Sequence, residues 1–479
     1  MIFFVILAMF LLGWSLLRTA FRRQLTSFEL WFAYPVGLSL TGLYLFLTWS
    51  ATIPFLMSTL VWWLLVLMSA GWVQWKYGAV SNTVSLWKGA QKELKEVANK
   101  LTQLSLPFSA WPLLYMGAAI ALAVGIAFVW QLTITPVSWD AVALYDFRAQ
   151  RVVDGWQLAD FAGQFARMEE YRAYDFLHPI TSSLWWALAY QSGARMVLLL
   201  YSVLLLCVLG AGWQLWKSWQ SRLVWPFLWL SMPALFVSLT EGYGAYPSAL
   251  FWVLGLLWIT ERIRRHKWLD VTFIDWGVLG ALVLGSVSAR ITEYYWFGAL
   301  LFSLFGFAYL VKFQGMKIVK SMQSLAALWI LPAVSVAVWF AERSWAVALT
   351  GTTDEDRSVS ALAESLLSQT PLALWNAFQE ELGHWLFSPA LPWIVLLVFA
   401  VIVFWRVKNR WPKEWTLWTG MAGIWLVFLL AGMIALHVVF GERWVEARQA
   451  MDRAILPILG VCFIWLTDLT ERFSQDSAR

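Results

Sequence analysis

The stretch Val137–Arg151 reads VSWDAVALYDFRAQR and follows directly after the apolar run Trp111–Leu132. It places Asp140, Asp146 and two arginines near a predicted membrane boundary, where charge is costly and is usually kept for a purpose. Two carboxylates six residues apart, with Tyr145 beside them, indicate a place for a hydroxyl acceptor or a sugar. An ordinary solvent-exposed loop explains the same pattern equally well. The choice between a functional site and such a loop therefore depends on the rest of the sequence.

Composition places the chain among polytopic membrane proteins. Of its 479 residues, 61% are hydrophobic and 13% are charged, against about 25% charged residues in soluble domains. Many of the 37 tryptophans stand near the ends of apolar runs, where indole rings favour the membrane interface. The basic residues behind the net charge of +5 lie in short clusters between apolar runs, which is not the charge pattern of a nucleic-acid-binding protein. Cys207 and Cys462 lie inside apolar runs and are interpreted as packing residues.

Apolar runs of about 17–25 residues are long enough to cross a bilayer as helices. About 13 such runs follow one another, which predicts an all-α polytopic membrane protein without a soluble domain. The first run is interpreted as a membrane helix, because a cleavable signal would begin with a basic segment. The expected spans are 2–17, 28–48, 55–75, 110–131, 195–216, 223–240, 246–261, 272–289, 294–312, 323–341, 389–405, 415–437 and 453–469.

The distribution of charge predicts an orientation. With the N-terminus outside, most of the 34 Lys and Arg residues fall on the inner side, and most of the 29 Asp and Glu residues fall on the outer side. The short run Pro179–Tyr190 is expected to be an interfacial helix in the first large outer loop, Thr133–Arg195. The lysine-rich segment Ser81–Leu104 has the spacing of an amphipathic helix on the inner surface. The expected parts are extra N-terminal helices with this segment (1–108), a membrane core (109–469) and an inner tail (470–479).

The expected outer loops gather the unusual charged and aromatic residues. The turn TEGYGAYP covers Thr240–Pro247, and ARITEYYWF covers Ala289–Phe297. The last outer loop, Gly441–Pro457, is rich in arginine. Carboxylates and arginines converge here from several loops, which a plain solvent-facing surface would not need.

The order of these motifs resembles that of membrane glycosyltransferases of the GT-C fold. WDAVALYDFRA (139–149) after a membrane helix, a short interfacial helix, TEGYGAYP (240–247), the R-x-x-E of RITE (290–293) and DRAILPIL (452–459) before the last helix follow in that order. Bacterial relatives of the aminoarabinose and protein O-mannosyl transferases are the most similar in pattern, over about 111–469. The chain departs from the family in having about four helices before the acidic loop instead of one. Its two acidic residues are spaced D-x5-D, whereas protein mannosyltransferases have adjacent Asp and Glu. The family pattern therefore does not by itself assign a role to Asp146.

This resemblance implies transfer of a sugar from a polyprenyl-phosphate donor to a glycan, lipid or protein acceptor. The reaction is expected at the extracytoplasmic face of the cell membrane, because the donor's tail lies in the bilayer and its sugar projects outward. Asp140 matches the family's catalytic position and is the expected general base, with Asp146 as a second carboxylate. The alternative role of Asp140 is to cap a helix that begins near Ala141.

The leaving group of that transfer is a phosphate ester, which arginine suits because its planar fork binds two oxygens at once. Arg290 and Arg453 are favoured for this role, followed by Arg148 and Arg448. The alternative for each is a helix-end arginine that meets lipid headgroups or pairs with a neighbouring carboxylate.

Contacts to the sugar or the acceptor are expected from polar and aromatic residues of the same loops. These residues are Glu241, Tyr243, Glu293, His178 and Tyr145. No His, Cys and Asp cluster has the spacing of a metal site, so no cofactor is firmly implied. A divalent ion held by the loop carboxylates stays open as an alternative.

Two other functions remain alternatives to the transferase. A lipid-linked oligosaccharide ligase or polymerase works on the same face with similar loops, but consumes a diphosphate-linked glycan. A lipid or sugar transporter would place polar residues and Gly/Pro breaks near the bilayer midplane. Here the middles of the apolar runs are almost free of charge, which disfavours transport.

Overall fold

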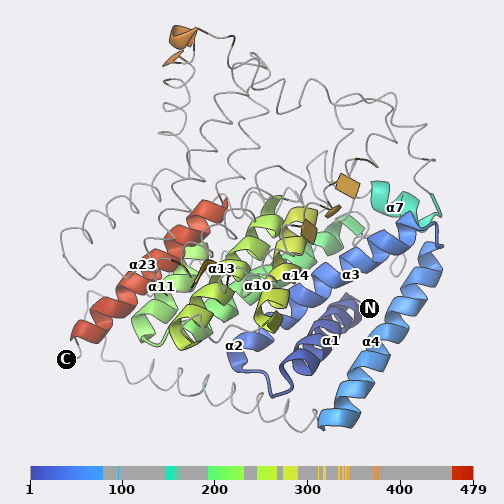
Figure 1. Cartoon of the computed structure of the whole chain (residues 1–479), viewed down its shortest axis with the longest axis horizontal. Coiled ribbons are helices and arrows are strands. Elements are labelled where there is room, and N and C mark those ends of the chain that lie inside the picture. Colours follow the sequence, from blue (N-terminus) through green and yellow to red (C-terminus); the bar gives the residue numbers. More distant parts are fainter. Residues whose placement is uncertain are drawn as a thin grey trace.

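A computed structural model of the chain describes residues 2–78, 147–156, 193–230, 245–266, 273–289 and 456–477, with short pieces between 95 and 379. These residues form helices, and no strand occurs among them (Figure 1). The helices are α1 (Ile2–Phe21), α2 (Ser27–Leu30), α3 (Ala33–Ser50), α4 (Phe55–Tyr77), α7 (Phe147–Val153), α10 (Gly193–Leu215), α11 (Trp219–Leu230), α13 (Ala245–His266), α14 (Phe273–Ala289) and α23 (Leu456–Ser477).

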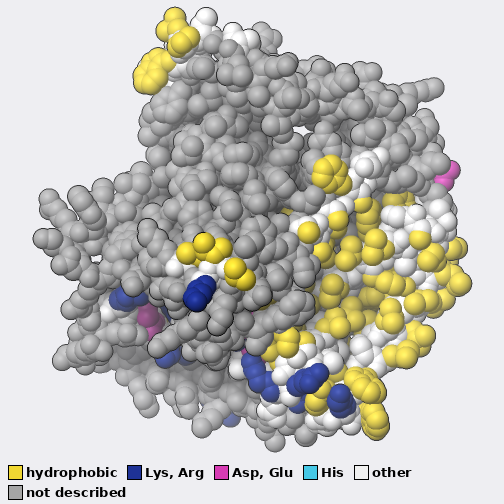
Figure 2. Space-filling model, in the orientation of Figure 1, with side chains coloured by type: hydrophobic (Ala, Val, Ile, Leu, Met, Phe, Trp, Pro, Cys, Tyr) yellow, Lys and Arg dark blue, Asp and Glu magenta, His cyan; other side chains and the backbone are white. Residues whose placement is uncertain are grey.

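Three stretches of the described residues are helical, long and apolar enough to cross a membrane, namely Phe3–Phe21, Ser27–Ser50 and Phe55–Tyr77. The helix α4 exposes a row of large apolar side chains that includes Leu60 and Leu67, and Figure 2 shows the apolar face to which they belong. Such a continuous apolar surface is stable against lipid and costly against water. The chain is therefore a membrane protein, as its composition predicts.

Other expectations fall outside the described residues, apart from isolated positions. They are the spans 110–131, 294–312, 323–341, 389–405 and 415–437, the second half of the span 223–240, the interfacial helix at Pro179–Tyr190 and the amphipathic helix at Ser81–Leu104. The total of about 13 spans and the GT-C arrangement accordingly stay predictions.

The ends of the first helices have recognisable chemistry. The Thr26 hydroxyl accepts a hydrogen bond from the Glu29 backbone N–H, and the Glu29 carboxylate accepts one from the Thr26 N–H, which forms a capping box at α2. Gly78 ends α4 with a φ of 57°, and its N–H donates to the carbonyl of Gln74. A glycine in this left-handed conformation is a common helix stop.

Several helices extend beyond the expected apolar runs. Helix α1 continues from 17 to Phe21, α13 from 261 to His266, and α23 from 469 to Ser477. Arg18 and Arg262, which the charge distribution places in inner loops, are therefore helical, and each is less than a tenth exposed. Arg262 is paired with carboxylates of neighbouring helices, and the guanidinium of Arg18 lies against the ring of Tyr77 in α4, as described below.

Helices α1 and α3 cross in backbone contact through two glycines. A Cβ atom built on Gly13 would lie 1.8 Å from the carbonyl oxygen of Ala33, and one on Gly37 would lie 1.8 Å from that of Met9. Small residues allow membrane helices to approach in this way, where van der Waals packing replaces the hydrophobic driving force. The expected spans 2–17 and 28–48 thus form a close helix pair.

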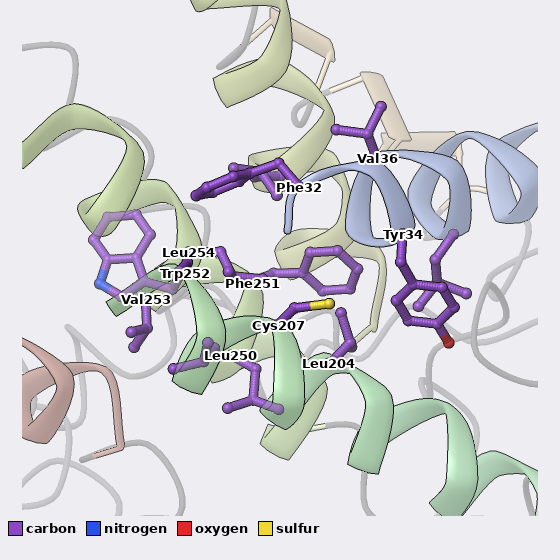
Figure 3. Close-up of a cluster of buried hydrophobic side chains, with 14 of the residues drawn as sticks. Phe32, Tyr34, Val36, Leu204, Cys207, Leu250, Phe251, Trp252, Val253 and Leu254 are labelled. Carbon is purple, nitrogen blue, oxygen red and sulfur yellow. The ribbon is translucent and has the colours of Figure 1, made fainter. Parts of the chain in front are cut away.

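The core is built around α13, whose Leu250, Val253 and Leu257 are fully buried. Figure 3 shows side chains of α13 meeting those of α3 and α10. Cys207 lies in this cluster, and both it and Cys462 are buried free thiols, which confirms that they are packing residues.

Polar side chains inside the bundle are used to join helices. The Ser286 hydroxyl donates to the backbone carbonyl of Ser248 at 2.8 Å, and the Ser248 hydroxyl donates to that of Ser286, which links α14 and α13. The indole N–H of Trp62 in α4 donates to the Thr41 hydroxyl in α3 at 3.0 Å. Each bond satisfies a donor that would otherwise be costly in hydrocarbon.

Candidate functional site

The described helices run in alternating directions, which creates two chemically different ends of the bundle. At one end, α1, α4, α10, α13 and α23 finish and α2, α11 and α14 begin, and we name it the ionic end for the contacts given below. At the other end, α3 finishes, α4 begins, and the short helix α7 lies against them (Figure 1). We name this second end the α7 end.

The helix α7 belongs to the stretch that the sequence singles out, and its position is tied to the N-terminal helices. The indole N–H of Trp49, at the end of α3, donates to the carbonyl oxygen of Trp156 at 3.0 Å. Val152 and Ala149 are fully buried, so one face of α7 is packed against protein. The position of α7 is therefore fixed by α3 and α4.

The two arginines of α7 have different surroundings. Arg148 is only 4% exposed, a depth at which a guanidinium needs hydrogen-bond acceptors or anions around it. Arg151 is on the surface, with its guanidinium over the rings of Phe147 (5.0 Å) and Trp156 (4.9 Å) and 3.3 Å from the carboxylate of Asp154. The sequence analysis names Arg148 alone as a candidate for phosphate binding, and the structure shows that Arg148 is buried whereas the side chain of Arg151 is about a third exposed.

Arg148 is the predicted site residue that the structure describes. The other predicted site residues lie outside the described residues: Asp140, Tyr145, Asp146, His178, Glu241, Tyr243, Arg290, Glu293, Arg448 and Arg453. In the sequence, Asp146 directly precedes α7, Tyr243 stands two residues before α13, and Arg290 directly follows α14. The beginning of α13 and the end of α14 are at the same end of the bundle, because Ser248 and Ser286 are in contact there.

The ionic end holds an ionic cluster that the sequence did not reveal, buried except for Arg23, whose side chain is 45% exposed. Its members are Arg23, Glu29, Glu261, Arg262 and Asp275. Both Arg23 (2.6 Å) and Arg262 (2.6 Å) contact Oε1 of Glu29, and Arg23 also donates to Oε2 at 2.9 Å. The Nε of Arg262 lies 2.8 Å from the Asp275 carboxylate, and its Nη1 lies 3.3 Å from the Glu261 carboxylate.

Burial makes this cluster energetically demanding. Glu29 is fully buried, and Glu261 and Arg262 are 2% and 4% exposed. Removing such charges from water costs several kcal/mol per ion, and close pairing between opposite charges is what recovers this cost. The guanidinium of Arg262 also lies 4.3 Å from the ring centre of Trp258, whose face attracts a cation. Hydrogen bonding to Glu29 raises the pKa of Arg23 above its ordinary value.

A second set of contacts joins α23 to the same end. Asp468 pairs with Arg264 of α13 and accepts a hydrogen bond from the Nε of Arg472 at 3.0 Å. The carboxylate of Glu471 accepts hydrogen bonds from the backbone N–H groups of Lys217 (3.2 Å) and Ser218 (2.8 Å), where α11 begins. A carboxylate at a helix N-terminus satisfies its free N–H groups and complements its dipole.

The chemistry of the ionic end is that of a joint between helices. Within the described residues, its carboxylates face guanidiniums and backbone N–H groups, and no group of three or more His, Cys, Asp or Glu side chains is arranged to hold a metal ion. A signal for this joint was present in the sequence: Glu29 is an acidic residue near the start of an apolar run. Its partner is 233 residues away, which no local pattern reveals.

Comparison with protein-family models, with curated proteins and with solved structures finds no match to this chain. The resemblance to GT-C glycosyltransferases therefore rests on the order of the sequence motifs alone.

Proposed function

We propose that this protein is a glycosyltransferase of the GT-C type, which moves a sugar from a polyprenyl-phosphate donor to an acceptor at the extracytoplasmic face of the cell membrane. The observation that carries the proposal is the buried Arg148 in α7, next to the acidic stretch, at the end of the bundle away from the ionic end. A desolvated arginine at a membrane boundary suits a lipid-linked phosphate, because charge-assisted hydrogen bonds strengthen as water is excluded.

Asp140 is the general base in the proposed reaction. Asp140 removes the proton from the acceptor hydroxyl while that oxygen attacks the anomeric carbon of the sugar. The bond from this carbon to the phosphate oxygen breaks, and the electron pair leaves with polyprenyl phosphate. The reaction is a single displacement, so the configuration at the anomeric carbon inverts.

Binding roles are assigned to the remaining loop residues by charge. Arg148, with Arg290, Arg453 and Arg448, holds the donor phosphate and stabilises the negative charge that it gains as the bond breaks. Asp146 contacts the sugar and the acceptor, together with polar and aromatic residues of the first large outer loop, of the stretch before α13 and of the stretch after α14. These residues are Glu241, Tyr243, Glu293, His178 and Tyr145.

The test is donor turnover by the full-length protein in nanodiscs. Wild type and Asp140→Asn are incubated with a panel of polyprenyl-phosphate monosaccharides and envelope lipid acceptors, and free polyprenyl phosphate is measured. Asp154→Asn is the matched control, because it removes a carboxylate that is a third exposed and paired with Arg151. The proposal expects release by wild type and by the control, and loss of release in Asp140→Asn.

The other outcomes separate the parts of the proposal. Release by all three proteins would keep the transferase and remove Asp140 from the chemistry. Consumption of a diphosphate-linked glycan alone would replace the transferase by the ligase or polymerase. No release from any lipid-linked donor would reject the proposal.

A further inference from the structure

At the ionic end, α1 and α4 bring two cations to one aromatic ring. The guanidinium of Arg18 lies 4.5 Å from the ring centre of Tyr77, and the ammonium of Lys76 lies 5.5 Å from the same centre. Lys76 also lies 5.4 Å from the ring centre of Trp72. We name Arg18 and Lys76 the Tyr77 cation pair.

Arg18 is buried with one of its guanidinium nitrogens lacking an acceptor. The residue is 8% exposed, and its Nη1 is buried with no hydrogen-bond partner. A buried donor left unsatisfied costs about 1–3 kcal/mol, and more when the group is charged. The ring of Tyr77 attracts the cation but supplies no acceptor for Nη1.

The position of both cations at helix ends explains only part of this arrangement. Arg18 is in the last turn of α1 and Lys76 in the last turn of α4, where the helix dipole favours positive charge by about 0.3–1 kcal/mol. That contribution supplies no hydrogen-bond acceptor for the buried Nη1 of Arg18. Arg23 is close in sequence but is already paired with Glu29, whereas the structure gives neither member of the Tyr77 cation pair a carboxylate partner within the part of the chain that it describes.

The surface beside these cations is suited to acyl chains. Leu64, Leu67 and Met68 of α4 are each more than half exposed, and Trp72 and Trp75 follow them toward the ionic end. Figure 2 shows Lys and Arg side chains gathered at the edge of this apolar face. Apolar side chains, then tryptophans, then cations follow the same order as the tail, interface and headgroup of a phospholipid.

We propose that the Tyr77 cation pair binds the phosphate of an anionic phospholipid whose acyl chains lie along α4. A phosphate oxygen supplies acceptors for Arg18, its charge relieves the repulsion with Lys76, and the tail covers the exposed side chains of α4. A zwitterionic lipid carries its own cation and relieves less of that repulsion. The site is at the opposite end of the bundle from α7 and takes a structural lipid.

The test is lipid-dependent thermal stabilisation of the full-length protein in detergent. Phosphatidylglycerol, phosphatidylcholine and inorganic phosphate are titrated separately, and the midpoint of unfolding is followed for each. Phosphatidylglycerol is expected to stabilise the wild type at concentrations at which the other two do not. In Lys76→Gln, about tenfold more phosphatidylglycerol is expected to be needed for the same shift, since an ionic hydrogen bond is lost. Arg18→Gln is expected to behave in the same way.

Lys217→Gln is the matched control, because Lys217 is an exposed lysine at the same end of the bundle. It is expected to keep the wild-type response to phosphatidylglycerol. Lys76 is exposed, so its variant tests the site even where Arg18→Gln fails to fold. Equal stabilisation by phosphatidylcholine, equal stabilisation by inorganic phosphate, or an equal loss in Lys217→Gln would each overturn the proposal.

Discussion

The Nη2 atom of Arg262 lies 2.6 Å from Oε1 of Glu29, although 233 residues separate the two along the chain. The same carboxylate accepts hydrogen bonds from Arg23 and from the backbone N–H of Thr26. Glu29 therefore stands at the centre of a joint that connects the N-terminal helices to α13 and, through Asp275, to α14.

Glu29→Gln is expected to lower the free energy of unfolding by about 3–5 kcal/mol, because it leaves the buried guanidinium of Arg262 without one of its anions. The change keeps the shape of the side chain, so packing is little altered. Unfolding of the detergent-solubilised protein by dodecyl sulfate measures the loss. Asp154→Asn is the control: it breaks an ion pair whose side chains are about a third exposed, and a loss of about 0–1 kcal/mol is expected. Equal losses in the two variants would contradict the role of burial.

Gly37→Ala is expected to cost about 1–3 kcal/mol, because its Cβ would lie 1.8 Å from the Met9 carbonyl oxygen and would push α1 away from α3. Gly71→Ala is the same chemical change in α4, where nothing lies within 4 Å of the new Cβ. That variant should be neutral or more stable by up to about 1 kcal/mol, from the helix propensity of alanine. The difference in unfolding midpoint between the two variants is the measurement, and a difference of zero would show that the close approach is unimportant.

Glu471→Ala is expected to destabilise the protein by about 1.5–3 kcal/mol, since the N–H groups of Lys217 and Ser218 lose a charged acceptor. Hydrogen exchange at the first turn of α11 should rise along with the loss of stability. Thr470→Ala is a neighbouring control in α23, because the Thr470 hydroxyl bonds only within its own helix, to the Leu466 carbonyl. Unchanged exchange at α11 in Glu471→Ala would mean that the cap is not needed.

Arg148→Gln is expected to lower transferase turnover by about 100-fold, the usual cost of one donor that stabilises developing charge. Arg151→Gln removes the same group from the exposed side of α7 and should leave turnover close to wild type. Arg148→Lys keeps the charge but loses the planar fork, so an intermediate rate is expected. Turnover and unfolding midpoint are measured on the same samples, which separates loss of phosphate binding from loss of folding.

Much of the helical frame follows from apolar periodicity and length alone. The runs 28–48, 55–75, 246–261 and 272–289 correspond to α3, α4, α13 and α14, because hydrocarbon requires closed backbone hydrogen bonding over such a length. The pattern misplaces the charged ends: Arg18 and Arg262 are in helices and buried, whereas their charge places them in loops. Hydropathy treats a charge as a cost and contains no information about a partner far along the chain.

The candidate site is less accessible to sequence reasoning than the frame. Residue type indicates that Arg148 and Arg151 both suit phosphate, but only the packing of α7 distinguishes the buried from the exposed side chain. The tether from Trp49 to Trp156 joins residues 107 apart and has no local signature. The assignments of Asp140, Arg290 and Arg453 stay predictions, since they lie outside the described residues.

The joint at Glu29 has a consequence for biosynthesis. A ribosome adds about 5–20 residues per second, so Arg262 is made roughly 10–50 s after Glu29. During that interval the growing chain holds a carboxylate at the start of its second long apolar stretch, and Arg23, six residues earlier, is available as a local partner from the beginning. Once α13 has been made, Arg262 adds a second ion pair to Glu29. The local contact with Arg23 then becomes part of a link between the first helices of the chain and a helix made much later.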